Sequence, residues 1–78
     1  MILYKFDVLE KLKEAGYTTY NLRKAKLLGE SVIQQLREEK LVSWANINTI
    51  CRLLGCQPGD LLYYVDDDFE KPTAIKIR

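Results

Sequence analysis

The sequence predicts an all-α domain of five short helices, because apolar residues recur at helical spacing behind helix-starting signals. Four times, an apolar residue stands before a candidate N-cap, and a second apolar residue follows five positions after the first. This is the spacing of a hydrophobic staple, in which the residue before the cap packs on the first turn of the helix. The pairs are Tyr17/Leu22, Leu28/Ile33, Val42/Ile47 and Cys56/Leu61. Connections of three or four residues would hold such helices in one compact core.

The candidate caps decide where the helices begin. Thr18 and Ser43 are strong N-caps, because a hydroxyl oxygen accepts a backbone N–H that lacks a helical partner. Gly29 is tolerated as a cap, whereas Gln57 is a poor one whose helix start is rescued by Pro58 in the first helical position. We therefore expect helices over 7–15, 19–26, 30–39, 44–54 and 58–65.

The two ends of the chain differ from this helical part. Segments 2–6 and 74–78 are β-prone, and the second alternates apolar with charged residues. Two interpretations stay open: the segments pair as antiparallel strands beside the helices, or they fray. The predicted division is residues 1–6 for an N-terminal segment and 7–65 for the helical domain. Residues 66–78 would form an acidic loop and a C-terminal strand.

Composition narrows the classes of function. The chain carries 12 basic and 11 acidic residues, so its net charge of +1 creates no strong global field. Residues 1–65 hold nine of the basic and seven of the acidic residues, which places the positive excess on the helical part. No apolar run approaches the roughly 20 residues of a membrane span. The first residues also lack the pattern of an export signal, so we expect a cytoplasmic protein without a membrane partner.

Catalytic and metal-binding patterns are missing from the sequence. There is no histidine, and Cys51 and Cys56 do not have a zinc-site spacing, so we interpret them as reduced apolar side chains. The acidic run 66–68 lacks the glycine and glutamate of a calcium loop. No nucleophile–base set and no glycine-rich phosphate loop is present. We expect no enzyme activity, no metal and no small-molecule cofactor.

Residues 18–37 are typical of a capped helix, a short turn and a second capped helix. In the second helix, Ile33 and Leu36 form an apolar side, while most of the remaining side chains are polar. A helix that enters the major groove needs apolar anchors behind and hydrogen-bonding groups in front. The residues alone favour equally a second interpretation, in which these polar groups only solvate an exposed face.

The downstream segments add a family resemblance. Leu22, Ile33 and Leu36, followed by 43–47 and by the Ile-Cys-x-x-Leu-x-Cys-x-Pro-x-Asp-Leu-Leu-like segment 50–62, resemble the Cro/lambda-repressor-type (XRE-like) helix-turn-helix domain of small bacterial transcription regulators. The resemblance covers about residues 7–65. It implies a five-helix lambda-repressor-like fold that binds double-stranded DNA sequence-specifically, with helix 30–39 in the major groove, and a homodimer.

The resemblance also assigns site residues. The base-contacting positions and their neighbours fall on Glu30, Ser31, Gln34 and Gln35, and the phosphate contacts on Thr19, Tyr20, Arg37 and Lys40. Glutamine can bind adenine through two hydrogen bonds, and arginine can bind guanine or phosphate.

The sequence departs from the family pattern at several positions. Leu27 stands where the turn usually has glycine, and Arg23 replaces a small alanine, which should alter how closely the two helices cross. Glu30, Glu38 and Glu39 place acidic groups near the expected phosphates. These acids favour an alternative function, a protein-interaction module such as an antitoxin-like or co-regulatory subunit.

Aromatic residues outside the motif have structural interpretations. We expect Trp44 to be a partly buried packing residue rather than a base-stacking one. Tyr63 and Tyr64 either cover the edge of the core or lie in a dimer interface.

Overall fold

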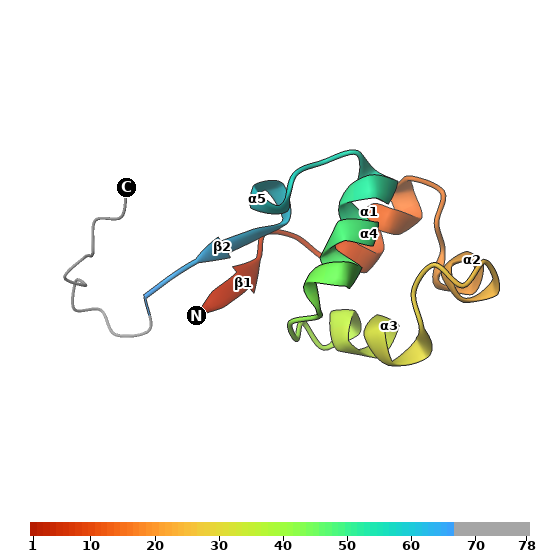
Figure 1. Cartoon of the computed structure of the whole chain (residues 1–78), viewed down its shortest axis with the longest axis horizontal. Coiled ribbons are helices and arrows are strands. Elements are labelled where there is room, and N and C mark those ends of the chain that lie inside the picture. The colour runs from red at the N-terminus through yellow and green to blue at the C-terminus, as the bar shows by residue number, and fades with distance from the viewer. Residues whose placement is uncertain (67–78) are drawn as a thin grey trace.

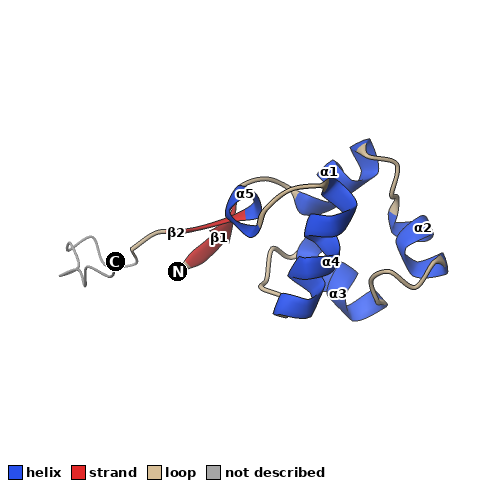
Figure 2. Cartoon of the chain, turned by 45° about the horizontal axis from the view of Figure 1, so that its top comes forward, coloured by secondary structure: helices blue, strands red, loops and turns tan. Residues whose placement is uncertain are grey.

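The computed structural model describes residues 1–66, which form a helical body and a two-stranded ribbon. The elements are β1 (Ile2–Tyr4), α1 (Val8–Glu14), α2 (Thr19–Lys24), α3 (Glu30–Arg37), α4 (Trp44–Leu54), α5 (Pro58–Leu61) and β2 (Leu62–Tyr64). In Figures 1 and 2 the ribbon extends from the helical body on the side opposite α2, with α5 next to the ribbon. The predicted five-helix fold is confirmed.

The helices begin at the expected caps. The side-chain oxygen of Thr18 accepts the N–H of Asn21 at 3.1 Å, and that of Ser43 accepts the N–H of Asn46 at 3.3 Å. At the start of α5, the carboxylate of Asp60 accepts the backbone N–H of the cap residue Gln57 at 2.9 Å. This bond compensates for the weak capping by the glutamine side chain. Capping bonds therefore explain the starts of α2, α4 and α5, whereas α3 begins after Gly29 without a side-chain capping bond.

Four helices end in a left-handed residue, and in two of them that residue is not glycine. These residues are Gly16, Lys26, Glu39 and Gly55. After α2, the N–H of Leu27 donates to Leu22 at 2.9 Å and that of Lys26 to Arg23 at 3.0 Å, which is a Schellman motif. The left-handed residue of this turn is thus Lys26 (φ 57°), one position before the leucine that replaces the usual glycine.

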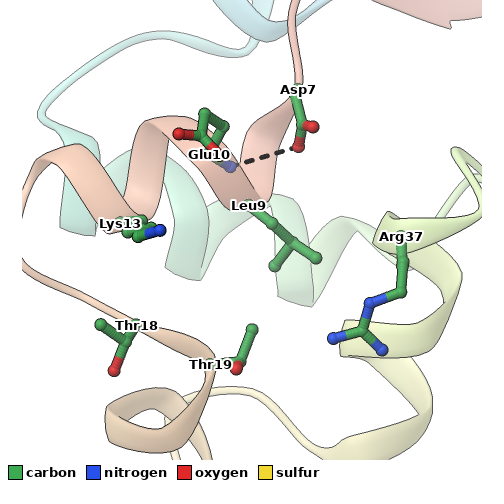
Figure 3. Close-up of a pocket in the computed structure, with 7 residues that line it drawn as sticks. All are labelled: Asp7, Leu9, Glu10, Lys13, Thr18, Thr19 and Arg37. Carbon is green, nitrogen blue, oxygen red and sulfur yellow. Dashed lines mark hydrogen bonds between the residues drawn. The ribbon is translucent and has the colours of Figure 1, made fainter.

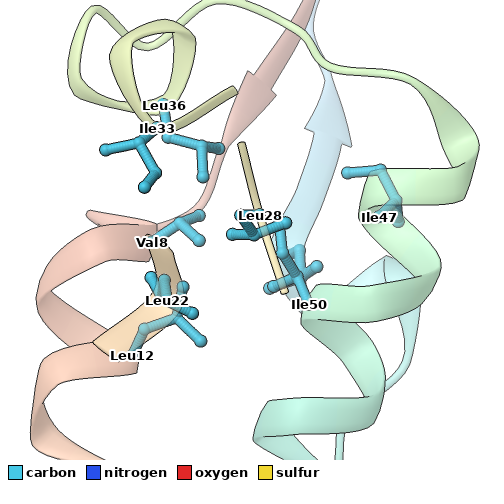
Figure 4. Close-up of a cluster of buried hydrophobic side chains, with 9 residues drawn as sticks. Val8, Leu12, Leu22, Leu28, Ile33, Leu36, Ile47 and Ile50 are labelled. Carbon is cyan, nitrogen blue, oxygen red and sulfur yellow. The ribbon is translucent and has the colours of Figure 1, made fainter. Parts of the chain in front are cut away.

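The core joins all five helices. Its nine buried side chains are Val8, Leu12, Leu22, Leu28, Ile33, Leu36, Ile47, Ile50 and Leu61 (Figure 4). The second residue of every predicted staple pair belongs to this set, and the first residue is buried in it or packs against it. No polar or charged side chain is buried among residues 1–66. Burial of these apolar side chains is the main stabilising contribution in so small a domain.

The predicted C-terminal end of the fifth helix, at residue 65, is wrong. Helix α5 stops at Leu61, and the next three residues pair with β1 in the register Ile2↔Tyr64, Leu3↔Tyr63 and Tyr4↔Leu62. Tyrosine and valine favour extended backbone, and β1 supplies the hydrogen-bonding partners that a further helical turn would otherwise provide. The N-terminal strand is therefore confirmed over residues 2–4. The partner we expected for it, segment 74–78, lies outside the described residues.

The expectation for Trp44 is also wrong, because 71% of its surface is exposed. Trp44 is the first residue of α4, and the inward face of that helix is occupied by Ile47 and Ile50. The indole therefore lies outside the core.

Candidate nucleic-acid interface

The α2–α3 unit directs one face of α3 to solvent. Leu22 and Leu28 are buried on either side of the turn, and Ile33 and Leu36 of α3 are buried against them. Val32 is partly buried against the same core. Since successive residues of a helix are about 100° apart, these anchors leave Glu30, Ser31, Gln34 and Arg37 exposed.

The four predicted base-contacting residues are not equivalent in position. Glu30, Ser31 and Gln34 are exposed on the outward face, whereas Gln35 is half-buried at its flank. The structure therefore brings three of them onto one face and places the fourth at its border.

Two of these four side chains are already engaged within the domain. The Nε of Arg23 lies 2.6 Å from the Oε1 of Glu30, which links α2 to the first residue of α3. The Gln34 amide donates to Glu38 at 2.7 Å and accepts from Arg37 at 3.0 Å. In the part of the chain that the structure describes, the side chains of Ser31 and Gln35 make no hydrogen bond. These two are the groups ready to bind without breaking a contact.

Sequence reasoning marked Arg23 and Glu30 as two separate departures, but they form one feature. The guanidinium compensates the carboxylate, so Glu30 does not present an uncompensated negative charge. Both side chains are well exposed, and such a pair contributes little to stability. Its main effect is on the charge of the surface. The two residues are seven positions apart in the chain, so only the crossing of α2 and α3 shows the pairing.

The predicted phosphate contacts fall in three places: a hollow beside α3, the exposed side of α2, and the loop that follows α3. Thr19 and Arg37 line one hollow between α1, α2 and α3, and Figure 3 shows the guanidinium turned towards the threonine. The same hollow is lined by Asp7, Glu10 and Lys13, so its charges are mixed. Tyr20 is exposed on α2.

The basic residue Lys24 lies beside Tyr20 on α2. The Nζ of Lys24 lies 5.6 Å from the centre of the Tyr20 ring, a cation–π distance. Lys24 and Arg23 are the basic residues of the last turn of α2, and the placement of Lys24 over the ring adds it to the candidate phosphate contacts. Sequence reasoning did not assign it this role, although the i,i+4 spacing contains the signal.

Lys40 belongs to a network at the end of α3. Its Nζ lies 3.2 Å from Glu38, whose pKa is lowered by the hydrogen bond from Gln34 and by Lys40. The backbone carbonyl of Lys40 accepts the hydroxyl of Tyr4 at 2.7 Å, so the ribbon holds the loop that carries the lysine. Burial raises the pKa of Tyr4, and the Val42 backbone lowers it by less.

Other chemistry is weakly represented. Among residues 1–66, no three or more His, Cys, Asp or Glu side chains gather where an ion would bind. Cys51 and Cys56 are free thiols, and burial raises the pKa of Cys56. The described helices include none with the length and hydropathy required to cross a membrane.

Comparison with known families agrees with this geometry. Residues 7–67 match the family model of the Cro/C1-type helix-turn-helix DNA-binding domain. No curated protein and no solved structure matches the chain. The match covers most of the 78 residues and includes α1 to β2. The chain therefore belongs to the Cro/C1-type helix-turn-helix DNA-binding domains.

Proposed function

We propose that this protein is a cytoplasmic transcription regulator that binds a specific double-stranded DNA sequence as a homodimer. It acts by binding rather than by catalysis. Helix α3 enters the major groove, and base contacts come from Glu30, Ser31, Gln34 and Gln35. Phosphate contacts come from Thr19, Tyr20, Arg37 and Lys40. The family supports DNA as the ligand, and the residues of α3 support sequence reading.

One observation carries the proposal of specificity. On the outward face of α3, Glu30 and Gln34 bond to other side chains of the domain. Ser31 on that face and Gln35 at its border make no side-chain hydrogen bond among the described residues. A bidentate glutamine–adenine contact discriminates by about 1–3 kcal/mol per base pair. The proposal therefore assigns most of the base discrimination to these two residues.

The small positive charge has a consequence for affinity. Nine basic and seven acidic residues over 1–65 leave a net charge of +2 on this part of the chain, and Lys5 of the N-terminal segment is one of the nine. Because phosphate contacts dominate non-specific binding, one domain alone should bind DNA weakly. Two copies on a palindromic site would let both half-sites contribute.

The direct test is selection of bound sequences from random duplex DNA, followed by fluorescence anisotropy on the selected site at several salt concentrations. We expect a palindromic consensus with half-sites about one helical turn apart. Lys40→Ala should weaken binding to all sequences and reduce the slope of log affinity against log salt by about 1. Failure to detect binding to any selected sequence at low salt would contradict the proposal.

A second candidate function keeps a specific observation behind it. Glu38 and Glu39 lie exposed at the end of α3, beside the expected phosphates. They favour a protein-interaction module, such as an antitoxin-like or co-regulatory subunit. A stoichiometric protein partner, recovered together with a failure to bind DNA, would select this function.

A further inference from the structure

The ribbon end of the domain carries an apolar surface that the DNA-binding function does not use. Two adjoining shallow hollows there are both lined by Ile2, Trp44 and Leu62. No Asp, Glu, Lys or Arg side chain of the described residues lines either hollow. We use the name Trp44 surface for the residues Ile2, Leu41, Trp44, Leu62, Tyr63 and Tyr64.

The ribbon within this surface packs on its own domain through Tyr4 and Leu62, whereas its other four residues are exposed. A two-stranded ribbon alone is marginally stable in water. The N–H of Val65 donates to the carbonyl of Met1 at 2.8 Å, and the N–H of Lys5 donates to the carbonyl of Leu61 at 2.7 Å. Because every second residue of an antiparallel strand bonds to its partner strand, the backbone groups of Ile2 point away from β2. The described sheet has only these two strands, so β1 presents an open edge there. An open edge flanked by apolar side chains favours association with another chain.

The exposed area matches what a stable dimer needs. Five residues of the surface are exposed: Trp44 (71%), Tyr64 (65%), Leu41 (53%), Ile2 (43%) and Tyr63 (42%). Taking about 150–250 Å² for a whole aromatic side chain and about 60–120 Å² for an aliphatic one, these fractions sum to about 330–560 Å² of exposed surface. A standard interface buries about 800 Å² per partner, of which about 56–65% is apolar, or about 450–520 Å², which lies within that range.

The location of the surface is compatible with DNA binding. None of the eight predicted DNA-contacting residues lines the two hollows. Helix α2 lies on the side of the body opposite the ribbon (Figures 1 and 2). Association through the ribbon end would therefore leave α2 and the outward face of α3 uncovered in both copies.

We propose that the Trp44 surface is the interface through which two copies of this chain associate around a two-fold axis. In such an interface the same patch lies on both sides, so each copy covers the apolar surface of the other. The proposal rests on the proposed function only in that it names the interface of the homodimer. Its test needs no DNA.

The first experiment uses the full chain and its single tryptophan. Sedimentation equilibrium should show a reversible monomer–dimer transition, and Trp44 emission should shift to shorter wavelength over the same concentration range. A chain that stays monomeric, with emission independent of concentration, would overturn the proposal.

Two variants then locate the interface. Trp44→Glu places an acid in the first turn of a helix, where it is tolerated, and Leu41→Lys changes an exposed loop residue to a base. Each should raise the dimer dissociation constant at least about 30-fold, the effect of an interface hot spot, while circular dichroism stays unchanged. If the wild type dimerises and both folded variants dimerise equally well, the interface lies elsewhere.

A control separates this proposal from the proposed function. Tyr20→Ala also removes an exposed aromatic residue, but on α2, so it should weaken DNA binding and leave the dimer constant unchanged. Conversely, Leu41→Gln, which adds no charge beside Lys40, should bind a single half-site duplex as tightly as the wild type. A wild-type dimer that binds no DNA would contradict the proposed function and leave the interface standing.

A last variant tests the other occupant, the chain's own residues 67–78. Ending the chain after Asp66 should leave the dimer constant within about threefold of the wild type. A shift of Trp44 emission to longer wavelength on truncation, at concentrations where the full chain is monomeric, would overturn the proposal in favour of the chain's own end.

Discussion

The α2–α3 unit and the ribbon end are both exposed, yet their chemistry is opposite. On α3, Glu30 and Gln34 have charged partners within the domain. At the ribbon end, Trp44 and its neighbours form a surface whose hollows have no charged lining among the described residues. A polar, charge-balanced face suits a hydrated and charged ligand, whereas an uncharged apolar face suits another protein surface. One core of nine side chains holds both faces.

The largest expected effect tests whether that core joins the two regions. Ile33→Ala should destabilise the domain by about 2–5 kcal/mol, because it leaves a cavity at a fully buried site. In urea, DNA binding and the fluorescence of Trp44 should then be lost in one shifted transition. Separate midpoints for the two signals would show that the regions unfold independently. Val32→Ala, at a half-buried position of the same helix, is the control and should cost less.

A second prediction divides the reading face. Gln35→Ala should cost about 1–3 kcal/mol on the selected site, and the loss should be confined to one base position. Gln34→Ala should cost less, because its amide must first leave Arg37 and Glu38. Anisotropy with single-base variants of the site measures both. A larger loss for Gln34 would show that its internal bonds position it for binding.

A third prediction concerns the contact between the two regions, in which Tyr4 donates to the carbonyl of Lys40. Tyr4→Phe should cost about 0.5–1.5 kcal/mol, the typical net contribution of one hydrogen bond. Urea unfolding of the variant and the wild type at neutral pH measures this difference.

The burial of the Tyr4 hydroxyl, which raises its pKa, predicts a pH dependence. The pKa of Tyr4 is raised above the usual 10.0, so folding favours the protonated hydroxyl. Its stabilisation should be fully present below pH 10.0 and decrease as pH rises through the higher folded pKa. Urea midpoints measured up to pH 11 should converge for wild type and Tyr4→Phe. A constant difference across this range would contradict the assignment.

The smallest effect tests the turn between α2 and α3. Lys26→Gly should stabilise the domain by about 1 kcal/mol, because glycine adopts a positive φ without steric cost. Ala25→Gly is the matched control: Ala25 is the C-cap of α2 with a φ of −85°, so glycine there should destabilise by about 0.5–1 kcal/mol. Thermal unfolding of both variants gives the two signs. A destabilised Lys26→Gly would mean that the lysine side chain supports the turn.

Local signals predicted most of the helical domain. Thr18 and Ser43 were recognised as caps because a cap bonds to a residue only three positions away. The buried residues of α3 and α4 followed from helical periodicity, which depends on neighbours within one or two turns. The same reasoning failed at Leu62, since the choice between a further helical turn and a strand depended on β1, about 60 residues earlier in the chain.

The site was predictable in its location but not in its internal contacts. The position of α3 and its polar residues could be expected from pattern and resemblance. The Arg23–Glu30 pair and the half-buried position of Gln35 could not, because they depend on how α2 and α3 cross. The exposure of Trp44 was missed for a related reason. A sequence pattern assigns an apolar residue to the core by default, and only the packed helices show which apolar residues are left outside the core.

By itself, the sequence determined the helices, their caps, the core and the family, because these depend on short-range spacing and on the burial of periodic apolar residues. The tertiary structure decided three further features: the strand pairing of β1 with β2, the compensation of Glu30 by Arg23, and the apolar surface around Trp44. Each of these joins residues from different elements, and their proximity is fixed only when the elements pack. The near-neutral net charge of the chain thus reflects two regions: a face of α3 on which Arg23 compensates Glu30, and an apolar surface around Trp44 whose hollows have no charged lining among the described residues.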